Sequence, residues 1–169
     1  YSKARFADLL VNNITSEKEI TPRPYLQPVN ARFIVLDEER DIIRKISDGM
    51  MIQKETGKGI DILEWSPWLG KTEIVRFIAG MTNREIIRVQ CAKMDPSDMF
   101  FSPQLKAGET SRQPAGWIQL MQKPGTVVLF DEIDKLSTEC FDRLHSLFDG
   151  WRSVYDAQIG SFQAHKDAV

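Results

Sequence analysis

The segment WSPWLGKT (residues 65–72) ends in three residues that can close a phosphate-binding loop: Gly70, Lys71 and Thr72. In such a loop a strand runs into a tight turn and a helix start, so that backbone N–H groups and the helix dipole converge on anionic oxygens. The lysine adds a positive charge at the outer phosphates, and the neighbouring hydroxyl ligates Mg²⁺. GKT alone is weak evidence, because the tripeptide occurs by chance in many proteins. We expect the phosphate-contacting residues to be Ser66, Pro67, Trp68, Leu69, Gly70, Lys71, Thr72 and Glu73.

A second cluster, Asp131 and Glu132, follows the apolar stretch of VVLFDEID. Ligands bind at the carboxyl ends of strands in open parallel sheets, so Asp131 would hold a hydrated Mg²⁺ there and Glu132 would orient or deprotonate a water. The alternative is that these two acids and Asp134 form a solvated acidic turn and that Lys71 is a surface cation. The order, spacing and strand context of both clusters favour phosphate chemistry. In that interpretation Lys71 and Glu132 are catalytic, and Thr72 and Asp131 are metal ligands.

These clusters need strands and helices to position them. Short apolar runs in GIDILEW (59–65), REIIRVQC (84–91) and TVVLFDEID (126–134) predict three strands. Helical spacing of apolar residues predicts a helix from Asp37 to near Gly57, a second in TEIVRFIAGM, and a third in ECFDRLHSLF. That third helix would carry Phe141, Leu144, Leu147 and Phe148 on one face. Alternation of strands and helices predicts an α/β fold with a parallel sheet covered on both faces.

The segments between these elements are less regular. Residues 1–30 combine a short amphipathic helix with the proline-rich linker TPRPYLQP. Met99, Phe100 and Phe101 belong either to the core, which we favour, or to a surface facing a pore. Residues 106–114 are polar and indicate a loop, either facing a partner or simply solvated. Residues 150–169 predict a hairpin or irregular loop and the beginning of a further strand.

Composition excludes several classes of function. The chain has 169 residues, 42% apolar and 27% charged, which is typical of about one globular domain. A net charge of −2 gives no global reason to expect nucleic acid or an anionic membrane. No run approaches the ~20 apolar residues of a membrane helix, and the N-terminus lacks a secretory signal. We therefore expect an intracellular, cytoplasmic protein. The first residue is Tyr1 and the last is Val169, without a helix or turn signal, which indicates a piece of a longer protein.

Neither cysteines nor histidines form a metal-binding pattern. Cys91 and Cys140 stand apart, without CxxC or CxH spacing, and we expect buried, reduced thiols. His145 and His165 are equally isolated. A metal site made only of side chains is therefore not expected.

The chain resembles the ATPase core of the AAA+ superfamily. VVLFDEIDKLSTECFDRLHSLFDGWRSVY is similar to its Walker B region, and MDPSDMFFSPQL and WIQLMQKPGTVVLFDEID resemble segments of the MoxR and midasin (dynein-related) branch. The resemblance covers roughly residues 31–169, with residues 1–30 as an N-terminal extension and linker. It implies a P-loop NTPase three-layer sandwich with a parallel sheet, truncated before the sensor-1 region and the helical lid.

The resemblance also implies an activity. Proteins of this superfamily bind ATP and Mg²⁺, assemble as rings, often hexamers of identical or different subunits, and couple hydrolysis to remodelling of a protein or nucleoprotein partner. Gly70, Lys71 and Thr72 match the end of Walker A; Asp131 and Glu132 match Walker B. The arginine finger and the sensor residues should lie beyond Val169. Arg143 and Arg152 do not stand where the finger belongs, and we assign neither.

Two tryptophans depart from the family pattern. Trp65 and Trp68 stand where the loop G-x-x-x-x-G-K-T carries its first and often its middle glycine. A side chain at a left-handed position costs about 1 kcal/mol or more. Either the indoles point away and leave Lys71 usable, or the loop no longer cradles a triphosphate and the protein is a non-catalytic scaffold subunit. A DNA-binding member of the superfamily has little support, because no basic stripe with interleaved aromatics is present.

Overall fold

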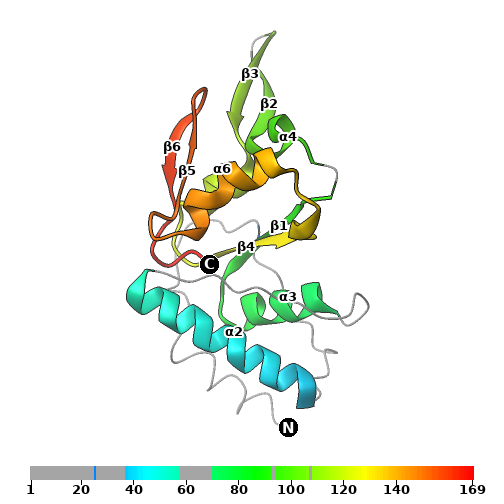
Figure 1. The fold of residues 1–169 in the computed structure, drawn as a ribbon, viewed down its shortest axis with the longest axis vertical. Coiled ribbons are helices and arrows are strands. Elements are labelled where there is room, and N and C mark those ends of the chain that lie inside the picture. The colour runs from blue at the N-terminus through cyan, green and yellow to red at the C-terminus, as the bar shows by residue number, and fades with distance from the viewer. Residues whose placement is uncertain (1–24, 26–36, 58–69, 93, 107) are drawn as a thin grey trace.

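The structure is a computed structural model that describes Tyr25 and residues 37–57, 70–92, 94–106 and 108–169 (Figure 1). Several predictions lie outside these residues. They are the N-terminal helix and linker, the strand in GIDILEW, and the loop residues Trp65, Ser66, Pro67, Trp68 and Leu69.

A parallel sheet lies at the centre of the fold. β1 (Glu85–Gln90) pairs with β4 (Thr126–Asp131) in a register that runs from Glu85 opposite Thr126 to Gln90 opposite Asp131. On the other side of β4, Ala168 forms a parallel bridge with Thr126. The N–H of Val128 donates to the carbonyl of Val169 at 2.7 Å. Residues 168 and 169 thus pair with β4 on the side away from β1, where the sequence predicts the beginning of a further strand.

Helices cover both faces of this sheet, as predicted. α3 (Lys71–Met81) packs on one face, where Ala79 meets Ile86 of β1 and Val127 of β4. On the opposite face α5 (Gly116–Met121) packs through Trp117 against Val128 and other apolar residues. Neighbouring residues of a strand point to opposite faces, which is why Val127 and Val128 meet different helices. The described residues therefore form the layered α/β arrangement that the alternation predicted.

α2 (Asp37–Thr56) forms a further layer beside α3 (Figure 1). The two helices share an apolar cluster of Ile43, Ile46, Met50, Ile74 and Ile78. The helix ends where the sequence predicted, because Gly57 adopts a left-handed φ of 69° that stops helical hydrogen bonding. The side-chain amide of Gln53 donates to the carbonyl of Ala168, which connects α2 to the third strand position of the sheet.

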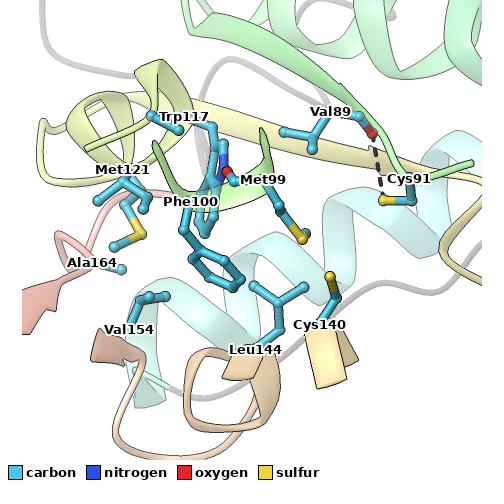
Figure 2. Close-up of a cluster of buried hydrophobic side chains, with 12 residues drawn as sticks. Val89, Cys91, Met99, Phe100, Trp117, Met121, Cys140, Leu144, Val154 and Ala164 are labelled. Carbon is cyan, nitrogen blue, oxygen red and sulfur yellow. Dashed lines mark hydrogen bonds between the residues drawn. The ribbon is translucent and has the colours of Figure 1, made fainter. Parts of the chain in front are cut away.

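The largest core cluster lies between the sheet, α5, α4 (Pro96–Phe100) and α6 (Thr138–Phe148). Figure 2 shows Phe100 and Leu144 converging there from α4 and α6. The indole N–H of Trp117 donates to the carbonyl of Met99 at 2.8 Å, which satisfies the buried polar atom. Met99 and Phe100 are both fully buried, which confirms the core interpretation of this segment.

The orientation of α6 determines which part of its apolar face is buried. Its buried residues are Cys140 and Leu144, one helical turn apart, whereas Phe141 is 45% exposed. Ser137 caps the helix by accepting a hydrogen bond from the N–H of Cys140 at 3.3 Å. Phe141 lies at the exposed edge of the apolar face, beside Phe148, with ring centroids 6.3 Å apart.

Two antiparallel ribbons complete the described structure. β2 (Phe101–Lys106) pairs with β3 (Glu109–Pro114), and β5 (Ser153–Asp156) pairs with β6 (Gly160–Gln163). Both extend beyond α6 on one side of the molecule (Figure 1). The second ribbon was predicted, but the loop predicted over 106–114 is wrong, because residues 109–114 form a strand. Pairing with β2 overrides the polar composition, since a two-stranded ribbon leaves much of its surface in water.

Candidate functional site

The first turn of α3 carries Lys71 and Thr72. Gly70 precedes the helix with φ 69° and ψ 30°, and its carbonyl accepts the first helical hydrogen bond from Ile74 at 3.0 Å. This left-handed conformation favours glycine. Lys71 and Thr72 are half-buried, and Glu73 is exposed and pairs with Arg76 at 3.3 Å. Both candidate phosphate-binding residues thus lie where helix N–H groups and the dipole are positive.

The carboxyl end of β4 carries the two acidic candidates. Asp131 is the last residue of the strand, and its backbone carbonyl accepts from the N–H of Cys91 at 2.9 Å. Glu132 follows with a positive φ of 56° and precedes the short helix η1 (Ile133–Lys135). Its carboxylate pairs with Lys135 at 3.1 Å, and both side chains are largely exposed.

Arg88 of β1 forms an ion pair with Asp131 that sequence reasoning missed. Its Nε and Nη2 atoms lie 2.7 and 2.5 Å from the same carboxylate oxygen, Oδ2. Nη2 also donates to the side-chain oxygen of Gln90 at 2.8 Å. Gln90 is opposite Asp131 in the parallel register, so Arg88, two residues earlier, lies on the same face of the sheet. Only the strand register could have revealed this contact.

A cavity of about 780 Å³ brings the two clusters together. It is lined by the start of α3 and by the end of β4, in addition to Arg88 and apolar residues of α2 and α5. Besides Gly70, the polar and charged residues of the lining are Gln53, Lys71, Thr72, Glu73, Arg88, Asp131, Glu132, Asp134, Lys135 and Arg152. Residues that are distant in the sequence therefore share one hollow of a size that suits a small-molecule ligand.

The donors around this cavity fit Mg²⁺ held partly by a ligand. Among the described residues, no group of three or more His, Cys, Asp or Glu side chains is placed to hold a metal ion. Mg²⁺ usually takes one or two carboxylates and completes its coordination with water and substrate phosphates. Asp131 and Thr72 supply hard oxygen donors of this kind at one cavity. The arrangement suits Mg²⁺ that arrives with a phosphorylated ligand better than a metal bound by the protein alone.

Cys91 is a free thiol next to the acidic candidates, because its backbone N–H donates to the carbonyl of Asp131. It is fully buried and free, and Cys140 is also buried and free, as predicted. Burial, with smaller contributions from Asp131, Cys140 and Glu132, raises the pKa of the Cys91 thiol to about 11. The thiol therefore stays protonated at neutral pH and is not a nucleophile there.

The two arginines left unassigned make structural contacts. Arg143 pairs with Asp156 at 3.0 Å and with Glu139 at 3.2 Å, and so connects α6 to the ribbon β5–β6. Arg152 donates to the carbonyls of Lys166 and Ala168 near the sheet. Burial lowers the pKa of Arg152. The contacts of Arg152 hold Lys166 and Ala168 in place beside the sheet.

Comparison with known families adds to this geometry. The family model of the AAA domain (dynein-related subfamily) matches residues 66–161, which is more than half of the chain. The match begins within the expected phosphate loop and extends through β4 and α6 into β6. No helix in the described part of the chain is long and apolar enough to cross a membrane. The chain belongs to the dynein-related subfamily of AAA domains and is a nucleotide-binding AAA+ module.

Proposed function

We propose that the chain is the ATP-binding core of a ring-forming ATPase that uses Mg·ATP hydrolysis to remodel a protein or nucleoprotein partner. The observation that carries this proposal is the shared cavity, which is lined both by Lys71 and Thr72 at the start of α3 and by Asp131 and Glu132 at the end of β4. A positive helix start and a pair of carboxylates are the two halves of a phosphoryl-transfer site.

The proposal gives each residue one task. Lys71 contacts the outer phosphates, and the backbone N–H groups of residues 66–73 follow the phosphate chain, except at Pro67, which has no N–H. Thr72 and Asp131 hold Mg²⁺, which neutralises charge on the phosphates when bound. Glu132 orients the attacking water and accepts its proton. Its exposed carboxylate reaches the cavity from a turn, so it can do this without moving β4.

We also propose that residues 31–169 form the core and residues 1–30 an extension. The packing of α2 supports this division, because its apolar face is buried against α3 and its Gln53 donates to Ala168. A helix with these contacts belongs to the core, not to a linker. Assembly into a ring, of identical or different subunits, is part of the same proposal and is supported by membership of the AAA family.

A second candidate is a scaffold subunit that occupies a ring position without turning over ATP. Two observations favour it: Trp65 and Trp68 replace loop glycines, and both acidic residues are ion-paired, Asp131 with Arg88 and Glu132 with Lys135. An enzyme must open these pairs during its cycle, whereas a scaffold need not.

Turnover by the longest natural form of the protein separates the two candidates. The variants are Glu132→Gln and, as a control with the same charge change at an exposed position of α2, Glu55→Gln. An ATPase predicts phosphate release that falls about 100-fold or more in Glu132→Gln, with nucleotide binding retained, and stays unchanged in Glu55→Gln. Nucleotide binding without phosphate release in the wild type would favour the scaffold. Release that is equal in wild type and Glu132→Gln would contradict the role of Glu132.

A further inference from the structure

The ion pair between Arg88 and Asp131 has a geometry that sets it apart from the surface pairs nearby. Two guanidinium nitrogens converge on one oxygen of Asp131, at 2.7 and 2.5 Å. Glu73 with Arg76 and Glu132 with Lys135 each show a single contact, at 3.3 and 3.1 Å. Charge-assisted hydrogen bonds of the shorter kind are the stronger ones.

The sheet fixes the backbone of Arg88 relative to Asp131. Arg88 and Asp131 lie on two strands with a continuous parallel register, and Gln90 holds Nη2 at 2.8 Å. The guanidinium is thus directed at the carboxylate by backbone pairing and by a second hydrogen bond. A flexible surface arginine would lack both constraints.

We propose that Arg88 is a competing counter-ion for Asp131, which must release the carboxylate before Asp131 can hold Mg²⁺. Arg88 therefore sets the Mg²⁺ concentration that nucleotide binding requires. This inference rests on the proposed function, because it assumes that Asp131 is the metal ligand of an ATP site.

Competition follows from charge and distance. Mg²⁺ needs a carboxylate oxygen at about 2.0–2.1 Å. Two guanidinium N–H groups already occupy Oδ2, and a second cation at the same oxygen is repelled by the first. The side chain of Arg88 is 46% exposed, so it is free to turn away from Asp131 without unfolding the strand. Arg88 lines the cavity as well, so its charge remains near the bound phosphates after release.

The size of the effect follows from the exposure of the pair. Asp131 is 27% exposed and Arg88 is 46% exposed, and ion pairs in such positions change equilibria by roughly two- to fivefold. Loss of Arg88 should therefore lower the Mg²⁺ midpoint of nucleotide binding by about two- to fivefold. The change is modest but lies within the resolution of a titration with a fluorescent nucleotide.

The experiment measures the affinity of the longest natural form for a fluorescent ATP analogue as a function of Mg²⁺ concentration. Arg88→Gln removes the counter-ion. Arg44→Gln is the control, because it removes the same charge from an exposed position of α2 that does not contribute to the cavity lining. Asp131→Asn and the double variant Arg88→Gln/Asp131→Asn complete a double-mutant cycle.

The expected result is a lower Mg²⁺ midpoint in Arg88→Gln, an unchanged midpoint in Arg44→Gln, and no effect of Arg88→Gln once Asp131 is Asn. An unchanged midpoint in Arg88→Gln would overturn the inference. A loss of affinity that is equal with and without Mg²⁺ would overturn it too, because Arg88 would then contact the phosphates directly.

Two further outcomes remain decisive. If Arg88→Gln does not fold, Arg88→Met tests the same point, because methionine keeps an unbranched apolar stem on the strand but carries no charge. Its midpoint must still fall, and an unchanged value overturns the inference. If the wild type binds no nucleotide at any Mg²⁺ concentration, the proposed function fails and the inference fails with it. Binding with an unchanged midpoint instead refutes only the role of Arg88.

Discussion

Glu132 adopts a backbone conformation in which glycine is less strained than any residue with a side chain. Its φ of 56° and ψ of 43° lie at the centre of the left-handed region. A side chain in that region costs roughly 1–2 kcal/mol. We therefore expect the turn that presents Glu132 to the cavity to reduce the stability of the fold.

Comparison of Glu132→Gly with Glu132→Ala isolates this strain. Both variants lose the carboxylate and its pair with Lys135, so they differ only in the Cβ atom. In Glu132→Gly, the relief of about 1–2 kcal/mol of backbone strain is partly offset by about 0.5–1 kcal/mol of extra conformational entropy that glycine loses on folding. We expect Glu132→Gly to be the more stable variant by about 0.5–1 kcal/mol.

Urea unfolding at neutral pH measures the difference, with Asp142 as the matched control. Asp142 is an exposed residue inside α6, where alanine should be more stable than glycine by about 1 kcal/mol. The order of the Gly and Ala variants should thus reverse between the two sites. Equal or greater stability of Glu132→Ala relative to Glu132→Gly would refute the account of backbone strain.

Three further predictions concern stability. In urea unfolding, Leu144→Ala should cost about 2–5 kcal/mol and Phe141→Ala under about 1 kcal/mol, because only Leu144 is fully buried; similar losses would contradict the orientation of α6. Asp167→Ala should cost about 3 kcal/mol, because it leaves Arg84, which pairs with Asp167 at 2.7 Å and is 1% exposed, buried without that carboxylate; a loss below about 1 kcal/mol would show that water reaches Arg84. In the folded protein the Cys91 thiol has a pKa of about 11, which is above the pKa of a thiol in the unfolded chain. The unfolded state therefore loses this proton first, and the contribution of Cys91 to the free energy of unfolding falls as the pH rises from about 9 to about 11. Urea unfolding of wild type and Cys91→Ala across that range should show that the difference between their free energies of unfolding shrinks as the pH rises. A difference that stays constant would contradict the raised pKa.

Elements governed by local pattern could be predicted from the sequence. The helical spacing of apolar residues identifies α2 and α3, because each helix must bury one face. The continuous apolar run identifies β4, because a strand inside a parallel sheet is covered on both faces. Gly57 marks the end of α2 for a similarly local reason, since its backbone conformation favours glycine. The parallel sheet followed from the order of these elements.

Features governed by non-local pairing could not be predicted. The strand β3 is polar, and only its partner β2 gives it a defined conformation. Phe141 and Cys140 are neighbours on the same helix, and the packing of α6 against Met94 and Phe100, not periodicity alone, decides which of them is buried. The pair between Arg88 and Asp131 depends on the register of two strands that are far apart in the sequence.

The central claim is that Lys71 at the start of α3 helps to bind Mg·ATP. Calorimetric titration of the longest natural form should compare wild type with Lys71→Ala and with Lys123→Ala, an exposed lysine outside the cavity lining. We predict micromolar binding that weakens about 10- to 100-fold in Lys71→Ala and is unchanged in Lys123→Ala. Equal binding by wild type and Lys71→Ala would contradict the claim. Absence of binding by the wild type would contradict it as well, and rescue by replacing Trp65 and Trp68 with glycine would then indicate an ATPase fold that serves assembly.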